Sequence, residues 1–316
     1  MKLISIVTPT YNEEENVRDL YEQTKKVFEG LPAYRYEHIF IDNASKDATV
    51  TILKEIAAQD PNVKIIVNSR NFGQIRSPMH GLLQASGDAV ALLLADLQDP
   101  PAMIADFIGK WEQGFKVVLG VKIGSQESWL LFRVRRFYYA LLYMISGTEL
   151  TKNNAGFGLY DRAFMNVLRE MKDPYPYFRG QIAEIGFERA EIPYHQPQRK
   201  RGLTKNNFFT LFDFALQGIT SYSKIPLRIA TILGMIFSAL GLLIALGYLI
   251  GKLVFWNNFP TGIAPLVIGG FTFLSLQLFF IGMLGEYIAA IHTQVLRRPL
   301  VVERERINFD TSSPPA

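Results

Sequence analysis

The sequence contains no cysteine and only four histidines among its 316 residues. The absence of cysteine excludes disulfides and thiolate metal sites and permits a reducing compartment. The histidines are scattered along the chain, which argues against a histidine-based zinc site. The N-terminus also lacks the apolar stretch of a secretory signal, because Met1 and Lys2 lead directly into a strand pattern at residues 3–7. We therefore expect about the first 220 residues to stay in the compartment where they are made.

Charged residues are missing from two long apolar stretches, residues 229–251 and 253–285. Each stretch is long enough to cross the hydrocarbon core of a bilayer, which takes about 20 apolar residues. Two buried helices of a soluble core are the alternative, but two uninterrupted stretches in succession rarely serve such a core. The sequence therefore predicts two transmembrane helices within residues 227–290.

Basic residues flank these stretches and predict which side of the membrane each end faces. They precede the first stretch and follow the second, whereas the loop between them carries a single lysine: Arg199, Lys200, Arg201, Lys205, Lys224 and Arg228 before, Arg297 and Arg298 after, and Lys252 between. Because cytoplasmic flanks are enriched in Lys and Arg, both termini are predicted to be cytoplasmic. Such flanks also attract anionic headgroups, so we expect membrane lipids and not nucleic acid as partners.

Residues 1–120 alternate between strand and helix patterns. Strands are predicted at residues 3–8, 36–41, 63–67, 89–94 and 117–121, and helices around 17–27 and at 49–59, 75–85 and 102–113. Strands separated by helices of this length indicate a doubly wound, mainly parallel α/β sheet. A further helix is predicted at residues 129–145. The aromatic segment 206–226 is expected to be an amphipathic helix in the membrane interface, with a soluble core helix as the alternative.

The fourth predicted strand ends in an acidic and amide-rich turn. Its apolar residues are followed by Asp96 and Gln98, and then by Asp99 and two prolines. A strand that ends here brings oxygen ligands to the carboxyl edge, where doubly wound sheets bind ligands. Carboxylate and amide oxygens suit Mg²⁺ or Mn²⁺, which usually share their coordination with phosphates. An acidic turn that merely closes a core strand is the alternative.

Polar residues also follow two other strands. Asp42 follows the second strand, and an acid at that position can accept hydrogen bonds from a ribose or from a base N–H, although an N-cap and turn is the alternative. Residues 70–73, Arg-Asn-Phe-Gly, follow the third strand. Together with Asp96 and Gln98, these residues predict a cleft for a nucleotide, its diphosphate and a metal ion.

These motifs together resemble those of family-2 inverting glycosyltransferases that act on polyprenyl phosphates, a group related to dolichol-phosphate mannose synthase. The similarity is greatest to the bacterial polyisoprenyl-phosphate glucosyltransferases of O-antigen and cell-envelope glycosylation, and it covers about residues 1–300. It implies a GT-A type fold, a metal bound by Asp96 and Gln98, and a set of nucleotide-binding residues. That set is Pro9, Tyr11, Asn12, Glu13, Asp42, Ser45, Asn71, Gly73 and Asp96.

The resemblance also implies a lipid phosphate as acceptor, and hence a reaction that needs no general base. A phosphomonoester has a second pKa near 6 and is already largely ionised at neutral pH. The reaction needs relief of repulsion between two phosphates, stabilisation of the leaving diphosphate and in-line placement of the acceptor oxygen. Asp96 is expected to act at the metal, and Arg199, Arg201 and Lys205 are expected to hold the acceptor phosphate. A lipid-facing anchor is the alternative for the basic run.

The sequence departs from the family pattern at two positions. Relatives often carry an acid where Leu94 stands here, two residues before Asp96, so one candidate metal ligand is missing. Relatives also often show an Asp-Phe-Arg-Leu stretch where this chain has Gly156 and the three residues after it. No catalytic base is therefore assigned from that segment.

The resulting prediction is a multi-pass enzyme of the inner (plasma) membrane. Its expected parts are a cytoplasmic GT-A domain (1–205), an interfacial segment (206–226), two membrane helices (227–290) and a cytoplasmic tail (291–316). It is expected to transfer a hexose with inversion, glucose from UDP-glucose, to undecaprenyl phosphate or a similar lipid, and to form a homo-oligomer, by the resemblance a tetramer. Alternatives are GDP-mannose or a UDP-linked amino sugar as donor, or a non-catalytic nucleotide-binding membrane protein. A processive synthase would show a Gln-x-x-Arg-Trp signature, which is absent.

Overall fold

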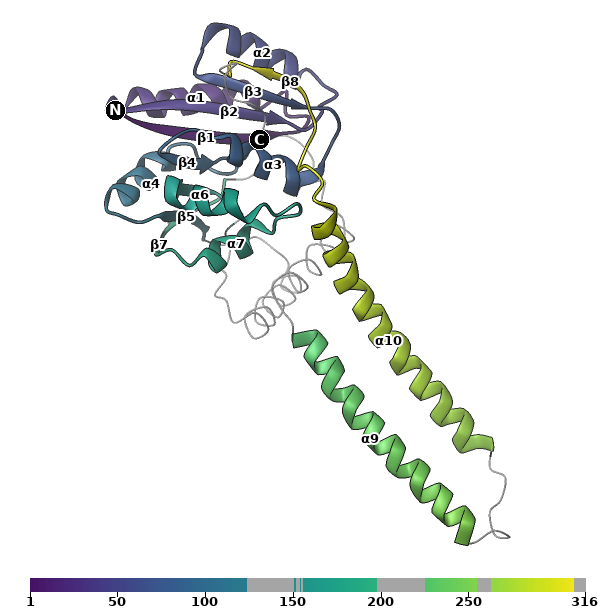
Figure 1. Ribbon diagram of the computed structural model, residues 1–316. Coiled ribbons are helices and arrows are strands. Elements are labelled where there is room, and N and C mark those ends of the chain that lie inside the picture. The colour runs from purple at the N-terminus through teal and green to yellow at the C-terminus, as the bar shows by residue number, and fades with distance from the viewer. Residues whose placement is uncertain (124–150, 152–153, 155, 198–224, 255–262, 310–316) are drawn as a thin grey trace.

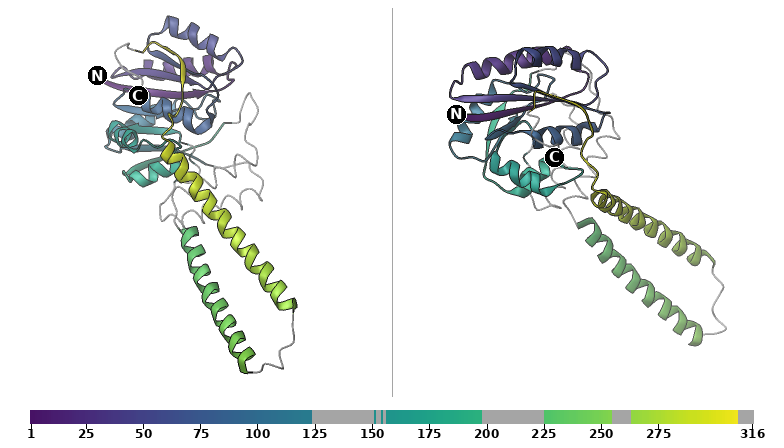
Figure 2. Two further views of the ribbon diagram at one scale, coloured as in Figure 1. Left: turned by 45° about the vertical axis from the view of Figure 1, so that its right-hand side comes forward. Right: turned by 45° about the horizontal axis from the view of Figure 1, so that its top comes forward.

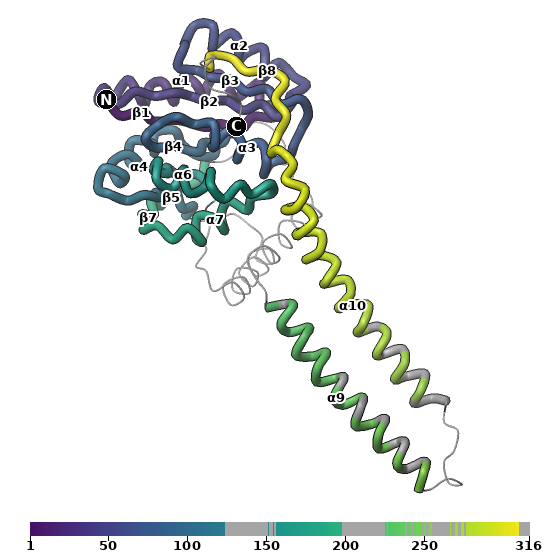
Figure 3. Tube along the Cα trace, in the orientation of Figure 1, coloured from purple at the N-terminus to yellow at the C-terminus, as the bar shows by residue number. Residues whose placement is uncertain are grey.

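The computed structural model describes residues 1–123, 151, 154, 156–197, 225–254 and 263–309. An α/β domain is followed by two long helices, after which the chain returns to the domain (Figure 1). Figure 2 shows the same arrangement from two further sides, and Figure 3 traces the path of the chain. The predicted helix at 129–145 lies outside these ranges, and so does the interfacial segment apart from residues 225 and 226.

The described part of the domain is built on one eight-stranded sheet with the order β7-β5-β6-β4-β1-β2-β3-β8. The strands are β1 (Lys2–Thr10), β2 (Tyr34–Asp42), β3 (Val63–Asn68), β4 (Ala89–Leu92), β5 (Val117–Lys122), β6 (Gly158–Asp161), β7 (Arg189–Tyr194) and β8 (Glu303–Ile307). β6 is antiparallel to β4 and β5, and β8 is antiparallel to β3, whereas the remaining pairs are parallel. The prediction of a mainly parallel α/β sheet is confirmed.

Helices cover both faces of this sheet because alternate residues of each buried strand point to opposite sides. In β1, Ile4 and Ile6 belong to one apolar cluster and Val7 belongs to the other. The first face packs against α1 (Val17–Glu29), α2 (Thr49–Gln59) and α4 (Met103–Glu112). The second face packs against α3 (Gly73–Gln84), α6 (Arg162–Met171) and α7 (Phe178–Ile185). The sheet is therefore doubly wound.

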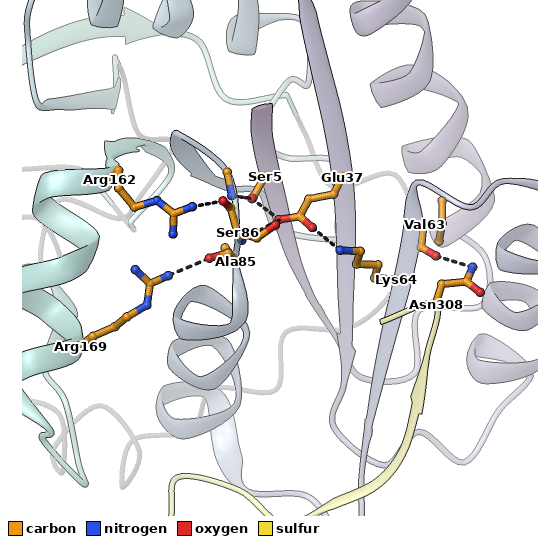
Figure 4. A network of polar contacts seen from close by, with 10 residues as sticks. Ser5, Glu37, Val63, Lys64, Ala85, Ser86, Arg162, Arg169 and Asn308 are labelled. Atoms are coloured by element: carbon orange, nitrogen blue, oxygen red, sulfur yellow. Dashed lines mark hydrogen bonds and ion pairs between the residues drawn. The ribbon is translucent and has the colours of Figure 1, made fainter. Parts of the chain in front are cut away.

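A buried carboxylate ties the central strands together toward their amino ends (Figure 4). Glu37 of β2 accepts hydrogen bonds from Ser5 of β1 and from the Ser86 backbone N–H and hydroxyl, at 2.7 and 2.8 Å. Lys64 of β3 lies 2.6 Å from its other oxygen. Burial alone raises the pKa of Glu37, but the hydrogen bonds from Lys64, Ser5 and Ser86 outweigh it and lower the pKa. Glu37 thus holds β1, β2 and β3 in register near their amino ends.

The two long helices, α9 (Ile225–Val254) and α10 (Ile263–Leu296), run alongside each other away from the domain (Figures 1 and 2). Their apolar side chains lie open; Leu243 and Leu278, for example, are 67% and 68% exposed. Exposed apolar surface on this scale calls for an apolar environment. Within the described residues, one segment, 276–296, is long and apolar enough to cross a membrane. A membrane span at the other apolar stretch, residues 229–251, stays a prediction.

The C-terminal segment after α10 returns to the sheet, although the sequence predicted only a tail for residues 291–316. β8 pairs with the edge strand β3, with Ile65 opposite Ile307 and Ile66 opposite Arg306. Val301, just before β8, is buried. The strand was not predicted because its sequence, Glu-Arg-Glu-Arg-Ile, shows no apolar alternation. The sheet thus draws its last strand from the chain beyond α10.

Candidate functional site

The carboxyl ends of three adjacent strands bring the predicted nucleotide residues to one edge of the sheet. Thr10, the last residue of β1, lies opposite Asp42, the last residue of β2, and Asp42 lies opposite Val67 of β3. Pro9 is inside β1, opposite Ile41, and Tyr11 follows directly after the strand. This is the edge at which doubly wound sheets bind ligands.

Asp42 is fully buried at this edge and accepts hydrogen bonds from two neighbouring residues. The backbone N–H and the hydroxyl of Ser45 lie 2.9 and 2.5 Å from its two oxygens, and the Thr10 hydroxyl is 3.3 Å away. Burial raises the pKa of Asp42 despite these donors. The carboxylate therefore fixes its own loop and keeps acceptor capacity toward a ligand N–H or hydroxyl.

Asn12 and Glu13 join the loop after β1 to the loop after β2. The Asn12 N–H donates to the Ser45 hydroxyl at 2.8 Å, and the Asn12 amide oxygen accepts from the Lys46 N–H at 2.8 Å. Asn12 itself has a positive φ of 54°, which asparagine tolerates better than most residues. The Glu13 N–H donates to the Thr49 hydroxyl at 2.9 Å. Two predicted nucleotide loops are thus built as one rigid wall.

The third loop is fastened to this wall by Asn43, a residue that the sequence analysis missed. Its amide nitrogen donates to the Asn71 side-chain oxygen at 2.9 Å and to the Gly73 carbonyl at 3.1 Å, and its oxygen accepts from the Phe72 N–H at 2.8 Å. Gly73 has a φ of 87°, a conformation that favours glycine. The signal for Asn43 was its place directly after a strand end, beside Asp42. Asn71 and Gly73 therefore lie next to the Asp42 loop.

Asp96 and Gln98 lie in the loop after β4, the strand on the other side of β1. β4 ends at Leu92, two residues earlier than predicted, although the Leu93 N–H still donates to the Val7 carbonyl at 3.0 Å. The Gln98 N–H donates to the Asp96 carboxylate at 3.2 Å. Between them, Leu97 has a φ of 57°, which is unfavourable for a branched apolar side chain. Both polar side chains are half-buried at the carboxyl edge.

The donor set of this loop fits a metal ion that shares its coordination with phosphates. Within the described ranges, no group of three His, Cys, Asp or Glu side chains is close enough to hold a metal on its own. Mg²⁺ usually keeps waters and takes only one or two carboxylates plus substrate phosphates. Asp96 and Gln98 supply one carboxylate and one amide oxygen, which suits that arrangement and not an all-protein cage.

A second carboxylate of the same loop, Asp99, is fully buried. One of its oxygens accepts a hydrogen bond from the Tyr194 hydroxyl at 2.5 Å and lies 4.0 Å from the Lys122 ammonium. The other oxygen has no hydrogen-bond partner in the described part of the chain. Burial raises the pKa of Asp99. Asp99 thus ties the loop to the ends of β5 and β7, a role that the sequence analysis did not assign.

The two departures from the family pattern lie close to this loop. Leu94 is half-buried and supplies no metal ligand. Gly156 has a φ of 98°, and a Cβ atom there would lie 3.2 Å from the Leu92 side chain and 3.3 Å from Phe178. Its N–H donates to the Asn154 side chain at 2.7 Å. An acidic side chain at this position would strain the backbone and crowd its neighbours, so the local fold requires glycine.

The remaining predicted residues, Arg199, Arg201 and Lys205, lie outside the residues that the structure describes. Their role at the acceptor phosphate stays a prediction. The segment that leads to them begins at Tyr194, whose hydroxyl donates to Asp99 in the loop after β4.

Comparison with known proteins gives a consistent result. The model for glycosyl transferase family 2 matches residues 5–173. The chain is 33% identical to an uncharacterized glycosyltransferase of Bacillus subtilis, covering 97% of this chain and 94% of that protein. It is 35% identical to a prophage-derived bactoprenol glucosyl transferase of Shigella flexneri, covering 94% and 96%. A solved mannosyltransferase of Pyrobaculum calidifontis, in complex with GDP-Man and Mn²⁺, aligns over 92% of this chain and 86% of its own, with 16% identity and a TM-score of 0.43.

Proposed function

The chain belongs to glycosyl transferase family 2 and is a glycosyltransferase, and from this premise we propose that it transfers a hexose from a nucleotide sugar to a polyprenyl phosphate. The expected reaction uses UDP-glucose and undecaprenyl phosphate and inverts the anomeric centre. Its product would be a lipid-linked sugar for cell-envelope or O-antigen glycosylation.

The observation that carries this proposal is the convergence of Asp42, Asn71 and Asp96 at the carboxyl ends of neighbouring strands. The loops after β1, β2 and β3 are joined by hydrogen bonds, so a ligand would meet a preformed wall with an acceptor for the base or ribose. The loop after β4, on the other side of β1, would supply oxygen ligands for a metal. The bactoprenol glucosyl transferases among its relatives support a polyprenyl phosphate as the acceptor.

In the proposed mechanism, the chain binds and orients two anionic substrates. Asp42 accepts a hydrogen bond from the nucleoside. The segment from Asn71 to Gly73 lies beside the Asp42 loop and lines the same site. Asp96 and Gln98 would hold Mg²⁺ or Mn²⁺, which supplies Lewis-acid stabilisation of the diphosphate when bound. The acceptor phosphate is already ionised at neutral pH, so no side chain has to remove a proton from it. Holding it in line with the anomeric carbon is the task proposed for the basic run near residue 200.

Membrane attachment follows from the acceptor and from α10. Its segment 276–296 could cross a bilayer by length and composition, and α10 ends on the side of the sheet to which β1, β2 and β3 run (Figure 1). We propose that residues 227–290 form two spans, with the catalytic domain (1–205, completed by β8) and both termini in the cytoplasm. We also propose a homo-oligomer, which the resemblance implies. Association of several chains would add helix–helix contacts in the membrane that two spans of one chain cannot supply.

The test is a panel of labelled nucleotide sugars incubated with the purified full chain, undecaprenyl phosphate and Mg²⁺. UDP-glucose should give a chloroform-soluble labelled glycolipid, and GDP-mannose and UDP-N-acetylglucosamine should give less. Label transferred from another donor would correct the sugar but keep the reaction. Nucleotide binding with neither release of nucleoside diphosphate nor lipid-linked product would overturn the proposal in favour of a non-catalytic protein.

A further inference from the structure

The C-terminal segment after α10 meets α3 in a cluster of charged side chains centred on Glu303. The His80 ring nitrogen of α3 lies 2.6 Å from one oxygen of Glu303. Arg306 lies 2.6 Å from the same oxygen and 2.8 Å from the other. Arg306 also donates to Gln84 at the end of α3, at 2.8 Å. The Glu303 carboxylate thus joins β8, which follows α10, to α3, which follows the loop after β3.

This cluster is sheltered from water, which strengthens its contacts. The side chains of His80, Glu303 and Arg306 are 10%, 17% and 20% exposed. The Arg306 guanidinium also lies 4.6 Å from the centre of the Phe309 ring. Although burial alone raises the pKa of Glu303, its hydrogen bonds with His80 and Arg306 lower the pKa to about 2. Glu303 is therefore a charged hub at neutral pH and not an incidental surface acid.

The same C-terminal segment also forms hydrogen bonds with the loop after β3 and with the start of α3. The Ser69 N–H donates to the Val302 carbonyl, next to Glu303, at 2.8 Å. Arg76 of α3 donates to the Pro299 carbonyl at 2.5 Å. Ser69 follows Asn68, whose side chain donates to Asn43 at 3.2 Å. The chain that leaves α10 is thus two hydrogen bonds away from the amide that fastens Asn71 and Gly73.

We propose that Glu303 is a positioning residue for the nucleotide-binding edge. By holding α3 and β8 together, it fixes the segment Ser69–Gly73, which begins at the end of β3 and runs into α3. Because β8 continues from α10, the membrane anchor and the nucleotide edge form one connected unit. The inference rests on the proposed function, since it assumes that a nucleoside diphosphate binds at this edge.

The test compares two carboxylates of the same strand in the full-length protein in detergent. Glu303→Gln keeps the shape of the side chain but removes its charge. Glu305→Gln is the matched control, because Glu305 pairs with Lys54 of α2 on an exposed surface, where the two side chains are 39% and 43% exposed. UDP and GDP are the calorimetric probes, and KM and kcat are measured with the nucleotide sugar that the wild type uses.

The expected result is a five- to tenfold weaker nucleotide affinity and a matching rise in KM for Glu303→Gln, with kcat within twofold of the wild type. Glu305→Gln should bind as the wild type does, and Glu303→Asp should recover part of the affinity. His80→Leu breaks the same contact from α3 and should reproduce the loss if Glu303→Gln does not fold.

Two outcomes would overturn the inference, and they are distinguishable. If the wild type binds a nucleotide and the folded variants of Glu303 and His80 bind it equally well, the cluster is only structural. If the wild type binds neither UDP nor GDP, the proposed function fails and the inference fails with it.

Discussion

Replacing Asp42 by asparagine is expected to weaken nucleotide binding roughly five- to twelvefold while the protein stays folded. Asp42 accepts three hydrogen bonds, from the Ser45 N–H, the Ser45 hydroxyl and the Thr10 hydroxyl. An asparagine oxygen can keep the backbone N–H, and its amide can donate to the two hydroxyls, which rotate to accept. The loop should therefore survive, with the loss of a charge-assisted bond costing about 1–2 kcal/mol of stability.

The substitution also removes a charge-assisted hydrogen bond to the nucleotide, which lowers the binding free energy. A hydrogen bond from a base N–H or a ribose hydroxyl to a buried carboxylate contributes about 1.5–3 kcal/mol, whereas one to the neutral asparagine oxygen contributes about 0.5–1.5 kcal/mol, so about 1–1.5 kcal/mol is lost. That loss corresponds to roughly a 5- to 12-fold increase in Kd, since about 1.4 kcal/mol is tenfold. Calorimetric titration of UDP and GDP into wild type and variant measures the difference.

Asp60→Asn provides the control, because this carboxylate is also buried but lies at the opposite end of the sheet. It precedes β3 and accepts from the Tyr21 and Tyr36 hydroxyls, at 3.0 and 3.2 Å, and from the Asn62 N–H at 2.9 Å. This variant should lower the thermal midpoint and leave nucleotide affinity unchanged. Equal nucleotide affinity in wild type and Asp42→Asn would refute the assignment of Asp42 to the ligand site.

Three further predictions concern the core, acid stability and the metal. Glu37→Gln leaves Lys64 without its carboxylate and should cost about 2–3 kcal/mol, seen as a fall of about 5–10 °C in the thermal midpoint without a change in nucleotide affinity. Because folding lowers the pKa of Glu303 from 4.5 to about 2, its contribution to stability, about 3 kcal/mol, is present above pH 4.5 and is lost as the pH falls toward 2. The difference in midpoint between wild type and Glu303→Gln should therefore shrink between pH 7 and pH 3, and a constant difference would contradict the lowered pKa. Chelation of divalent ions by EDTA should abolish glycolipid formation, and Mg²⁺ or Mn²⁺ should restore it; full activity in EDTA would exclude the metal.

The sequence correctly predicted the helices and strands that are determined by local patterns of neighbouring residues. Helix α2 begins and ends where the pattern placed it, at Thr49 and Gln59, and the first three strands match within two residues at each end. Buried parallel strands read as continuous apolar runs, which explains this agreement. The same rule misjudged β4, because Leu93 and Leu94 continue the apolar run after the strand has ended.

Features built from distant residues were not predictable in this way. β8 is a charged strand whose partners, His80 and Lys54, lie 223 and 251 residues away along the chain. Asn43 matters through Asn71, which is 28 residues away. No local pattern contains such contacts. Motifs at strand ends imply a shared edge, so the sequence could predict that these residues lie near one another, whereas the side chains that fasten the loops together required the structure.

We propose that the chain transfers a sugar to a lipid phosphate at a site that depends on Asp96. The most direct test incubates wild type and Asp96→Ala with labelled UDP-glucose, undecaprenyl phosphate and Mg²⁺, and counts label in the chloroform phase. We expect labelled glycolipid from the wild type and at least a hundredfold less from the folded variant, because a carboxylate that holds the diphosphate through a metal contributes about 3 kcal/mol or more to the transition state. Equal product from both proteins would contradict it.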